Sequence, residues 1–136
     1  MRTSMKTVLA AVAAIILSTG LMARADQQEL PKVKEVVVGI NDAYIPGGFD
    51  SDSEAYVVTS GIFPNGCYTY KRSEVSHVDN FNHEIKSVAA VSQGMCLMVL
   101  VPFTKEVKLG KLNSGKHTLK FLNGDGTYLE KTMAVE

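Results

Sequence analysis

Three histidines, His77, His83 and His117, are the side chains of this 136-residue chain whose ordinary titration range lies nearest neutral pH. His77 and His83 flank the segment V-D-N-F-N, which is typical of a turn, so the two rings could meet across a hairpin. With Asp79 in that turn, two imidazoles and a carboxylate form a candidate site for zinc or copper. Two solvent-exposed loop histidines are the favoured interpretation, because the spacing provides no third imidazole or thiolate ligand.

Methionine and cysteine could also bind copper in the segment Met95-Cys96-Leu97-Met98. In a strand, Met95 and Met98 point to opposite faces, because their separation is an odd number of residues. We therefore interpret both methionines as core residues. Apolar residues occupy both faces of the run 95–103, which predicts a central strand that is covered on both sides.

No pattern in the chain is typical of a catalytic site. Ser60 and Ser114 each precede a glycine, but neither lies in the G-x-S-x-G turn that exposes a nucleophilic serine. Glycine-rich phosphate-binding loops are also missing from the sequence. We expect a non-catalytic protein that uses no cofactor.

The first 25 residues have the three-part form of a secretory signal peptide. Two bases lie within residues 1–7, ten apolar residues follow at 8–17, and the segment ends in the cleavage pattern Ala23-Arg24-Ala25. Ten residues of helix span about 15 Å, half of a bilayer's hydrocarbon core, which disfavours a permanent membrane anchor. We predict a mature protein that starts at Asp26, with a flexible lead-in over residues 26–32, in the periplasm or outside the cell.

Two cysteines, Cys67 and Cys96, are therefore expected to meet an oxidising environment. Because their number is even and no C-x-x-C spacing is present, we predict a structural disulfide rather than a redox pair or metal ligands. It would close a loop of about 30 residues and stabilise the domain by roughly 3 to 4 kcal/mol.

Short β-branched and aromatic runs fill the rest of the chain, with Gly, Pro, Asn and Asp between them. The clearest alternation covers residues 116–122, where His117, Leu119 and Phe121 share one face of a predicted strand. Alternation at 106–112 places Val107 and Leu109 together in the same way. This pattern predicts one all-β domain over residues 33–136, an antiparallel sandwich of about seven to eight strands. The predicted strands cover residues 33–40, 55–63, 67–78, 81–91, 95–103, 106–112, 116–122 and 127–135.

Residues 109–119 read L-G-K-L-N-S-G-K-H-T-L. This run resembles the L-G-x-L-x-x-G-x-Y-T segment of bacterial immunoglobulin-like sandwich domains, and the order of Pro64-Asn65-Gly66-Cys67, Cys96 and Val101-Pro102-Phe103 ahead of it is similar to uncharacterised exported domains of that kind. The resemblance implies an immunoglobulin-like β-sandwich over residues 33–136. It also implies that His117 occupies the place of a structural corner tyrosine, whose hydroxyl bonds to upstream backbone.

The charges of the chain are segregated along the sequence. Fourteen bases balance 14 acids, but removal of residues 1–25 leaves 11 bases against 14 acids, a net charge of −3 that disfavours nucleic acid as a partner. A possible interaction surface is formed by five lysines that lie close together in sequence: Lys105, Lys108, Lys111, Lys116 and Lys120. We expect an exported binding or structural module for a protein or envelope component. The alternatives are a periplasmic carrier of copper or zinc, using His77, Asp79 and His83, and a small inhibitor of an exported hydrolase.

Overall fold

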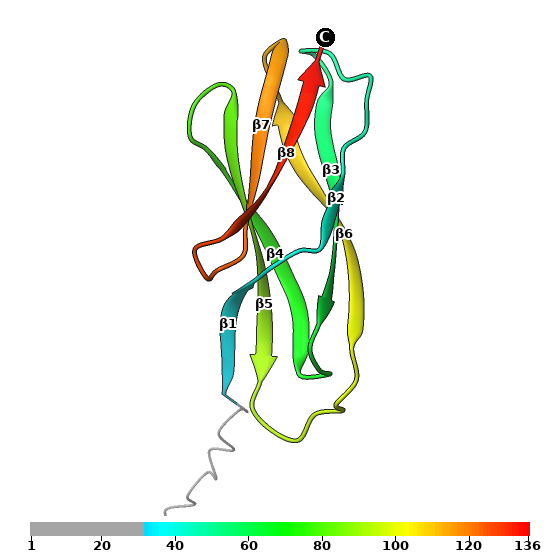
Figure 1. Cartoon of the computed structure of the whole chain (residues 1–136), viewed down its shortest axis with the longest axis vertical. Coiled ribbons are helices and arrows are strands. Elements are labelled where there is room, and N and C mark those ends of the chain that lie inside the picture. Colours follow the sequence, from blue (N-terminus) through cyan, green and yellow to red (C-terminus); the bar gives the residue numbers. More distant parts are fainter. Residues whose placement is uncertain (1–31) are drawn as a thin grey trace, which may run out of the picture.

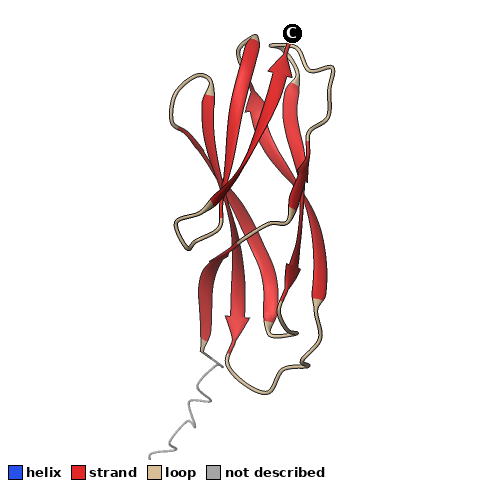
Figure 2. Ribbon diagram, in the orientation of Figure 1, coloured by secondary structure: helices blue, strands red, loops and turns tan. Residues whose placement is uncertain are grey.

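The computed structural model describes residues 32–136, which form strands and connecting loops without a helix (Figure 2). The predicted signal peptide at 1–25 and residues 26–31 of the predicted lead-in lie outside the described residues. No helix of this described part is long and apolar enough to cross a membrane. The eight strands are β1 (Val33–Val38), β2 (Asp42–Tyr44), β3 (Glu54–Phe63), β4 (Tyr68–His77), β5 (Asn82–Ser92), β6 (Val101–Lys111), β7 (Gly115–Leu122) and β8 (Tyr128–Val135).

The strands form two packed sheets, which confirms the predicted β-sandwich (Figure 1). The first sheet has five strands, and β5 is at its centre. β4 pairs with β5, β1 pairs with residues 87–92 of β5, and β7 pairs with residues 82–86 of β5 and also with β8. The second sheet has three strands in the order β2-β3-β6. All pairs are antiparallel except β5 with β7, which run parallel. The parallel pair departs from the fully antiparallel sandwich that we predicted.

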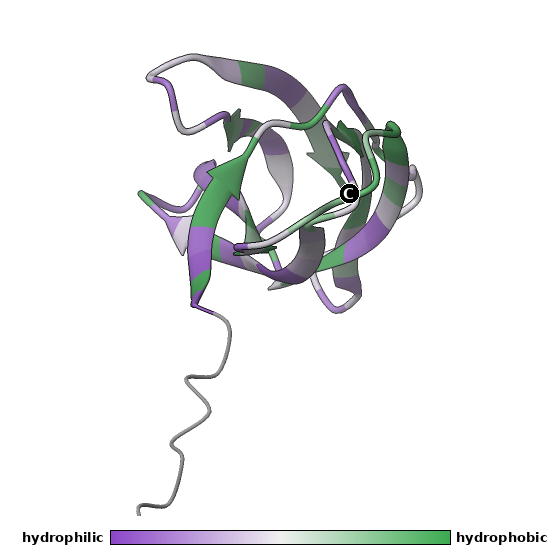
Figure 3. Ribbon diagram, turned by 90° about the horizontal axis from the view of Figure 1, so that it is seen from below, coloured by the Kyte–Doolittle hydropathy of each residue, from purple (hydrophilic) through white to green (hydrophobic). Residues whose placement is uncertain are grey.

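Side chains that alternate along β6 and β7 fill the space between the sheets, as the sequence predicts. His117, Leu119 and Phe121 are all buried on β7, and Val107 and Leu109 are buried on β6. The four apolar residues of this set belong to the larger hydrophobic cluster, and Phe63, Ala89 and Phe103 form a second cluster towards the end where β3 ends and β6 begins. Bands of hydrophobic and hydrophilic residues follow one another along the strands (Figure 3).

The segment 95–100 differs from its prediction. It is an exposed loop, and β6 begins only at Val101, so Met95 and Met98 are solvent-exposed and not core residues. The strand that is covered on both faces is β5, where residues 87–90 are all buried. Pattern alone does not distinguish a buried apolar run from an apolar loop, because neither has a polar alternation.

Cys67 and Cys96 form a disulfide, which confirms the predicted pairing. The bond joins the residue before β4 to the loop between β5 and β6. Two backbone hydrogen bonds accompany it: the Gly66 amide donates to the Leu97 carbonyl at 2.8 Å, and the Ser92 amide donates to the Cys67 carbonyl at 3.0 Å. The loop is thus fixed at its middle although its side chains point into solvent.

Gly61 on β3 permits the close approach of an aromatic ring. A Cβ at this position would lie 2.5 Å from Cζ and 2.6 Å from Cε1 of Phe103, whose ring stacks on Phe63. We expect Gly61→Ala to lower the free energy of unfolding by about 1 to 3 kcal/mol in urea titrations, because the packed ring must move. Gly47→Ala is the matched control, since nothing lies within 4 Å of a Cβ there. An equal, small effect of both substitutions would contradict this packing argument.

Candidate functional site

Three imidazole rings form a continuous hydrogen-bonded row at the end of the sandwich where β4 ends and β5 begins. We call His77, His83 and His117 the histidine chain. Nδ1 of His77 lies 2.6 Å from Nδ1 of His83, and Nε2 of His83 lies 2.8 Å from Nδ1 of His117. The row ends where Nε2 of His117 lies 2.6 Å from the backbone carbonyl oxygen of Asn113.

Sheet register explains why these three residues meet. His77 and His83 are directly opposite each other across the β4–β5 hairpin. The parallel pairing of β5 with β7 places His83 opposite Leu119, and His117 lies two residues before Leu119 on the same buried face. The structure therefore brings together all three histidines that the sequence analysis singled out, two of them through a short turn and the third through a long-range contact.

The direction of each hydrogen bond in the histidine chain follows from the contact between His117 and the Asn113 carbonyl oxygen. A carbonyl oxygen only accepts, so Nε2 of His117 carries a hydrogen and, in the neutral ring, its Nδ1 accepts from Nε2 of His83. Nδ1 of His83 then accepts from Nδ1 of His77. Nε2 of His77 is left as the one ring nitrogen of the chain without a partner in the described part of the protein.

His117 is the residue for which the family resemblance implied a corner role, and that role stays a prediction. Its ring is fully buried and donates to backbone four residues upstream, in the loop between β6 and β7. The ring of Phe81 covers it at a centroid distance of 5.1 Å. His83 is also buried, and burial, followed by the neighbouring charges of His77 and His117, lowers its pKa to about 4.

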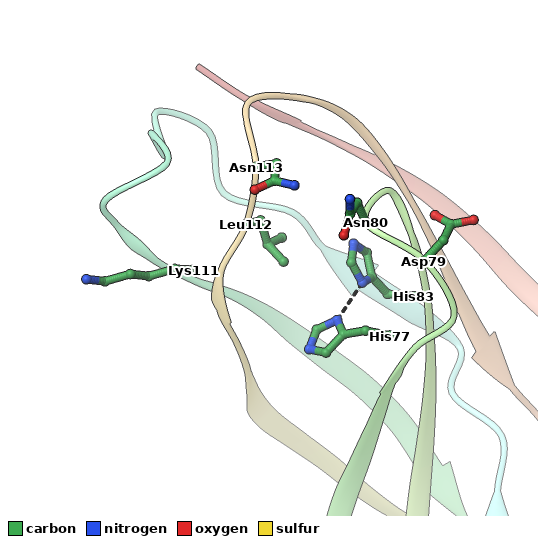
Figure 4. Close-up of a pocket in the computed structure, with 7 residues that line it drawn as sticks. All are labelled: His77, Asp79, Asn80, His83, Lys111, Leu112 and Asn113. Carbon is green, nitrogen blue, oxygen red and sulfur yellow. Dashed lines mark hydrogen bonds between the residues drawn. The ribbon is translucent and has the colours of Figure 1, made fainter.

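Beside the histidine chain lies a small open hollow of about 140 Å³ (Figure 4). In Figure 4 the rings of His77 and His83 point toward each other, whereas the side chains of Asp79 and Lys111 point away from them. The hollow is lined by His77, Asp79, Asn80, His83, Lys111, Leu112 and Asn113. Its size and polar lining suit a water molecule or a small polar group rather than a large ligand.

Asp79 stabilises the turn between β4 and β5. Its Oδ1 accepts from the backbone amides of Phe81 and Asn82 at 2.8 Å, and the Asn82 side-chain amide donates to both carboxylate oxygens. The Phe81 amide and the Asn82 side chain hold the pKa of the Asp79 carboxyl below its usual value. His77, Asp79 and His83 thus do not converge on one point, and residues 32–136 contain no group of three or more His, Cys, Asp or Glu side chains arranged for a metal ion.

The five lysines of the predicted interaction surface are divided between the two sheets. Lys105, Lys108 and Lys111 lie on β6 of the three-stranded sheet, and Lys116 and Lys120 lie on β7 of the five-stranded sheet. Lys105 lies over the ring of Tyr70, and Lys120 lies over the ring of Tyr128. Closeness in sequence does not produce one lysine-rich face, because the turn after β6 carries the chain to the other sheet.

A second candidate site lies at the opposite end of the sandwich, where the sequence analysis predicted core. We call residues 95–100 the apolar loop. Leu97 is 76% exposed and Met98 is 82% exposed, and three further members, Met95, Val99 and Leu100, are also more than half exposed. Contiguous exposed apolar side chains are uncommon on the surface of a folded domain, which makes this loop a candidate interaction site. The sequence shows that no charged residue lies between Lys86 and Lys105, but this does not distinguish an exposed apolar loop from a buried strand.

The chain matches a family model. The family model described as "ORF11 beta-sandwich domain" matches residues 57–135, from β3 to the end of β8. No curated protein and no solved structure matches the chain. The matched range includes both the histidine chain and the apolar loop.

Proposed function

The chain belongs to the ORF11 beta-sandwich domain family. We propose that it is a non-catalytic binding module that contacts its partner through the apolar loop. The observation that carries the proposal is the exposure of five apolar side chains between positions 95 and 100 on a loop held by a disulfide. Contact between these apolar side chains and water is unfavourable, so the burial of their surface under a partner stabilises the complex.

The proposal includes export of the protein by a bacterial cell and an immunoglobulin-like arrangement of its sandwich. Residues 1–25 support export, because they have the charged, apolar and small-residue parts of a signal peptide. The Cys67–Cys96 disulfide supports the same conclusion, since disulfides persist in the periplasm and outside the cell. Together they favour a periplasmic or secreted protein that recognises an envelope component.

The geometry of the histidine chain favours a structural role over the metal carrier that the sequence left as an alternative. Both ring nitrogens of His83 are hydrogen-bonded, so a metal ligand at His83 would have to give up one of these bonds, and Asp79 would have to leave its turn. The other alternative, a small inhibitor of an exported hydrolase, is the special case of the binding module in which the partner that covers the apolar loop is an enzyme.

Photo-crosslinking in the source cells tests the binding proposal. A photoreactive amino acid in place of Leu97 is expected to form adducts with an envelope component, whereas the same amino acid in place of Tyr44, which is 68% exposed on β2, is expected to form none. Adducts with a protein are detected as mass-shifted bands, and adducts with a lipid are detected by mass spectrometry of the peptide that carries position 97.

The same samples report the position of the N-terminus, which tests export separately. If position 97 yields no adduct while the protein is abundant and folded, the apolar loop is not the binding site. If the mature protein still starts at Met1, export through a cleaved signal peptide is wrong, whatever the crosslinks show.

A further inference from the structure

The apolar loop projects from one end of the molecule, beside the β3–β4 turn and the start of β1 (Figure 1). Between positions 95 and 103 the side chains are Met, Cys, Leu, Met, Val, Leu, Val, Pro and Phe, and Cys96 is in the disulfide. The exposed part of this segment therefore has no side chain that could form a strong hydrogen bond with a partner.

Protein interfaces usually require such bonds. They contain about one hydrogen bond for every 100 to 200 Å² of buried surface, and their energetic centres are rich in Trp, Tyr and Arg. The apolar loop has methionine, leucine and valine instead, which suit a medium that needs no specific polar contacts. The boundary between lipid headgroups and acyl chains is such a medium.

Three lysines lie in the half of the sandwich that carries the apolar loop, one at the end of the sheet and two nearer the middle of their strands. Lys34 on β1 is opposite Val91, next to the last residue of β5, and Lys71 lies at the irregular step of the β4–β5 pairing opposite residues 88–89. Lys105 on β6 is opposite Thr59, four residues along the strand from Val101. Within residues 32–136 none of the three lysines forms a salt bridge.

The carboxylates near these lysines are partly neutralised. Arg72 forms a two-pronged ion pair with Glu35, at 3.0 and 2.9 Å, and also contacts Glu74 at 2.9 Å. Glu106 remains on the outward face of β6. At the other end of the molecule, loop 45–53 and the β4–β5 turn carry Asp50, Asp52 and Asp79 (Figure 1). The end with the apolar loop is thus the more basic end.

We propose that the partner of the apolar loop is an anionic lipid bilayer surface, into which Met95, Leu97, Met98 and Leu100 insert while Lys34, Lys71 and Lys105 face the headgroups. The inference rests on the binding function proposed above and names its partner. The first described residue, Lys32, precedes β1 at this same end and is a further exposed basic residue there.

Tryptophan fluorescence tests the insertion directly, because the chain has no tryptophan of its own. We expect the emission of the Leu97→Trp variant to shift to shorter wavelength when vesicles of mixed phosphatidylcholine and phosphatidylglycerol are added. The Tyr44→Trp variant is the matched control, since Tyr44 is similarly exposed on the three-stranded sheet, and its emission should stay constant. Vesicles of phosphatidylcholine alone should give a weaker shift, because the lysines then lack anionic headgroups.

Sedimentation of the protein with vesicles measures how much the apolar side chains of the loop contribute to membrane partitioning. The protein used is the full chain as the expression host processes it. The double substitution Met98→Ser, Leu100→Ser should reduce partitioning into the mixed vesicles at least about tenfold, since each side chain no longer buries apolar surface. Val78→Ser, which removes an exposed apolar side chain at the opposite end, should leave partitioning unchanged.

Three results would overturn the lipid proposal: equal emission shifts in the Leu97→Trp and Tyr44→Trp variants, unchanged partitioning of the double serine variant, or a concentration-dependent shift of the Leu97→Trp variant without vesicles. The last result would identify a second copy of the chain as the occupant. A protein adduct from position 97 without vesicle binding would preserve the binding function and reject lipid as its partner.

Discussion

Substitution of both cysteines, Cys67→Ala with Cys96→Ala, is expected to lower the free energy of unfolding by about 3 to 4 kcal/mol. The residues are 29 positions apart, so the disulfide removes many conformations from the unfolded chain. In the folded protein it also fixes a loop that buries few side chains of its own, since most of residues 95–100 face solvent. Urea unfolding at constant pH measures the difference.

Reduction of the wild-type protein provides the control for the side-chain change. Wild-type protein in excess reductant should unfold at nearly the same urea concentration as the double alanine variant, and reductant should not affect that variant. A loss below about 1 kcal/mol would contradict the prediction. It would mean that the backbone bonds of Gly66 to Leu97 and of Ser92 to Cys67 hold the loop without help.

The same loop shows where sequence reasoning fails in this fold. Strands β6 and β7 were predictable because polar and apolar residues alternate, and each alternation corresponds to one exposed and one buried face. Residues 95–100 have no alternation, so the sequence carries no information on whether they are covered. β2, with three residues Asp42, Ala43 and Tyr44, was missed because it is short and pairs with residues 58–60 of β3, which are distant in sequence.

The histidine chain was predictable only in part, and the reason is topological. A turn of a few residues fixes the distance between His77 and His83, so their encounter follows from local sequence. The contact of His83 with His117 depends on the parallel pairing of β5 and β7, which joins residues 34 positions apart. Nothing in the spacing of three histidines indicates that pairing. The five lysines show the opposite case, because the turn after β6 places residues that are close in sequence on two different sheets.

Acidification should destabilise the domain in a window set by His83. In the unfolded chain this residue has a pKa of 6.5, and in the folded protein burial and the charges of His77 and His117 lower it to about 4. Between these values the unfolded chain binds a proton that the folded protein does not bind. The free energy of unfolding therefore falls as the pH falls, by at most about 1.4 kcal/mol per pH unit.

The charged groups around His83 have opposing effects. His77 and His117 oppose its protonation, Asp79 favours it weakly, and the side chains of Lys111, Lys120 and Glu84 line the hollows next to it. A proton on Nδ1 of His83 would also face the hydrogen on Nδ1 of His77, so one bond of the histidine chain would break. Because solvent reaches the His77 end, we expect a loss of about 2 kcal/mol over the whole window rather than the maximal value.

Carboxylates affect a different pH range. The carboxyls of Glu35 and Asp42 have pKa values below 4.5 and 3.8, because Arg72 and Lys131 bind their charged forms. Stability from these groups is present above those unfolded values and is lost as the pH falls through the lower folded values. The decline between pH 6.5 and about 4.5 is therefore assigned to His83.

Substitution His83→Gln separates the titration from the packing. At pH 7 we expect a loss of about 1 to 3 kcal/mol, because a glutamine amide is not shaped to donate to His117 and accept from His77 at once. Between pH 6.5 and 4.5, however, urea unfolding of this variant should depend less on pH than that of the wild type, so the two stability curves converge on acidification. His77→Gln is the control, since it leaves the buried pair of His83 and His117 in place and should retain most of the slope. Parallel curves for wild type and His83→Gln would show that a group other than His83 takes up the proton.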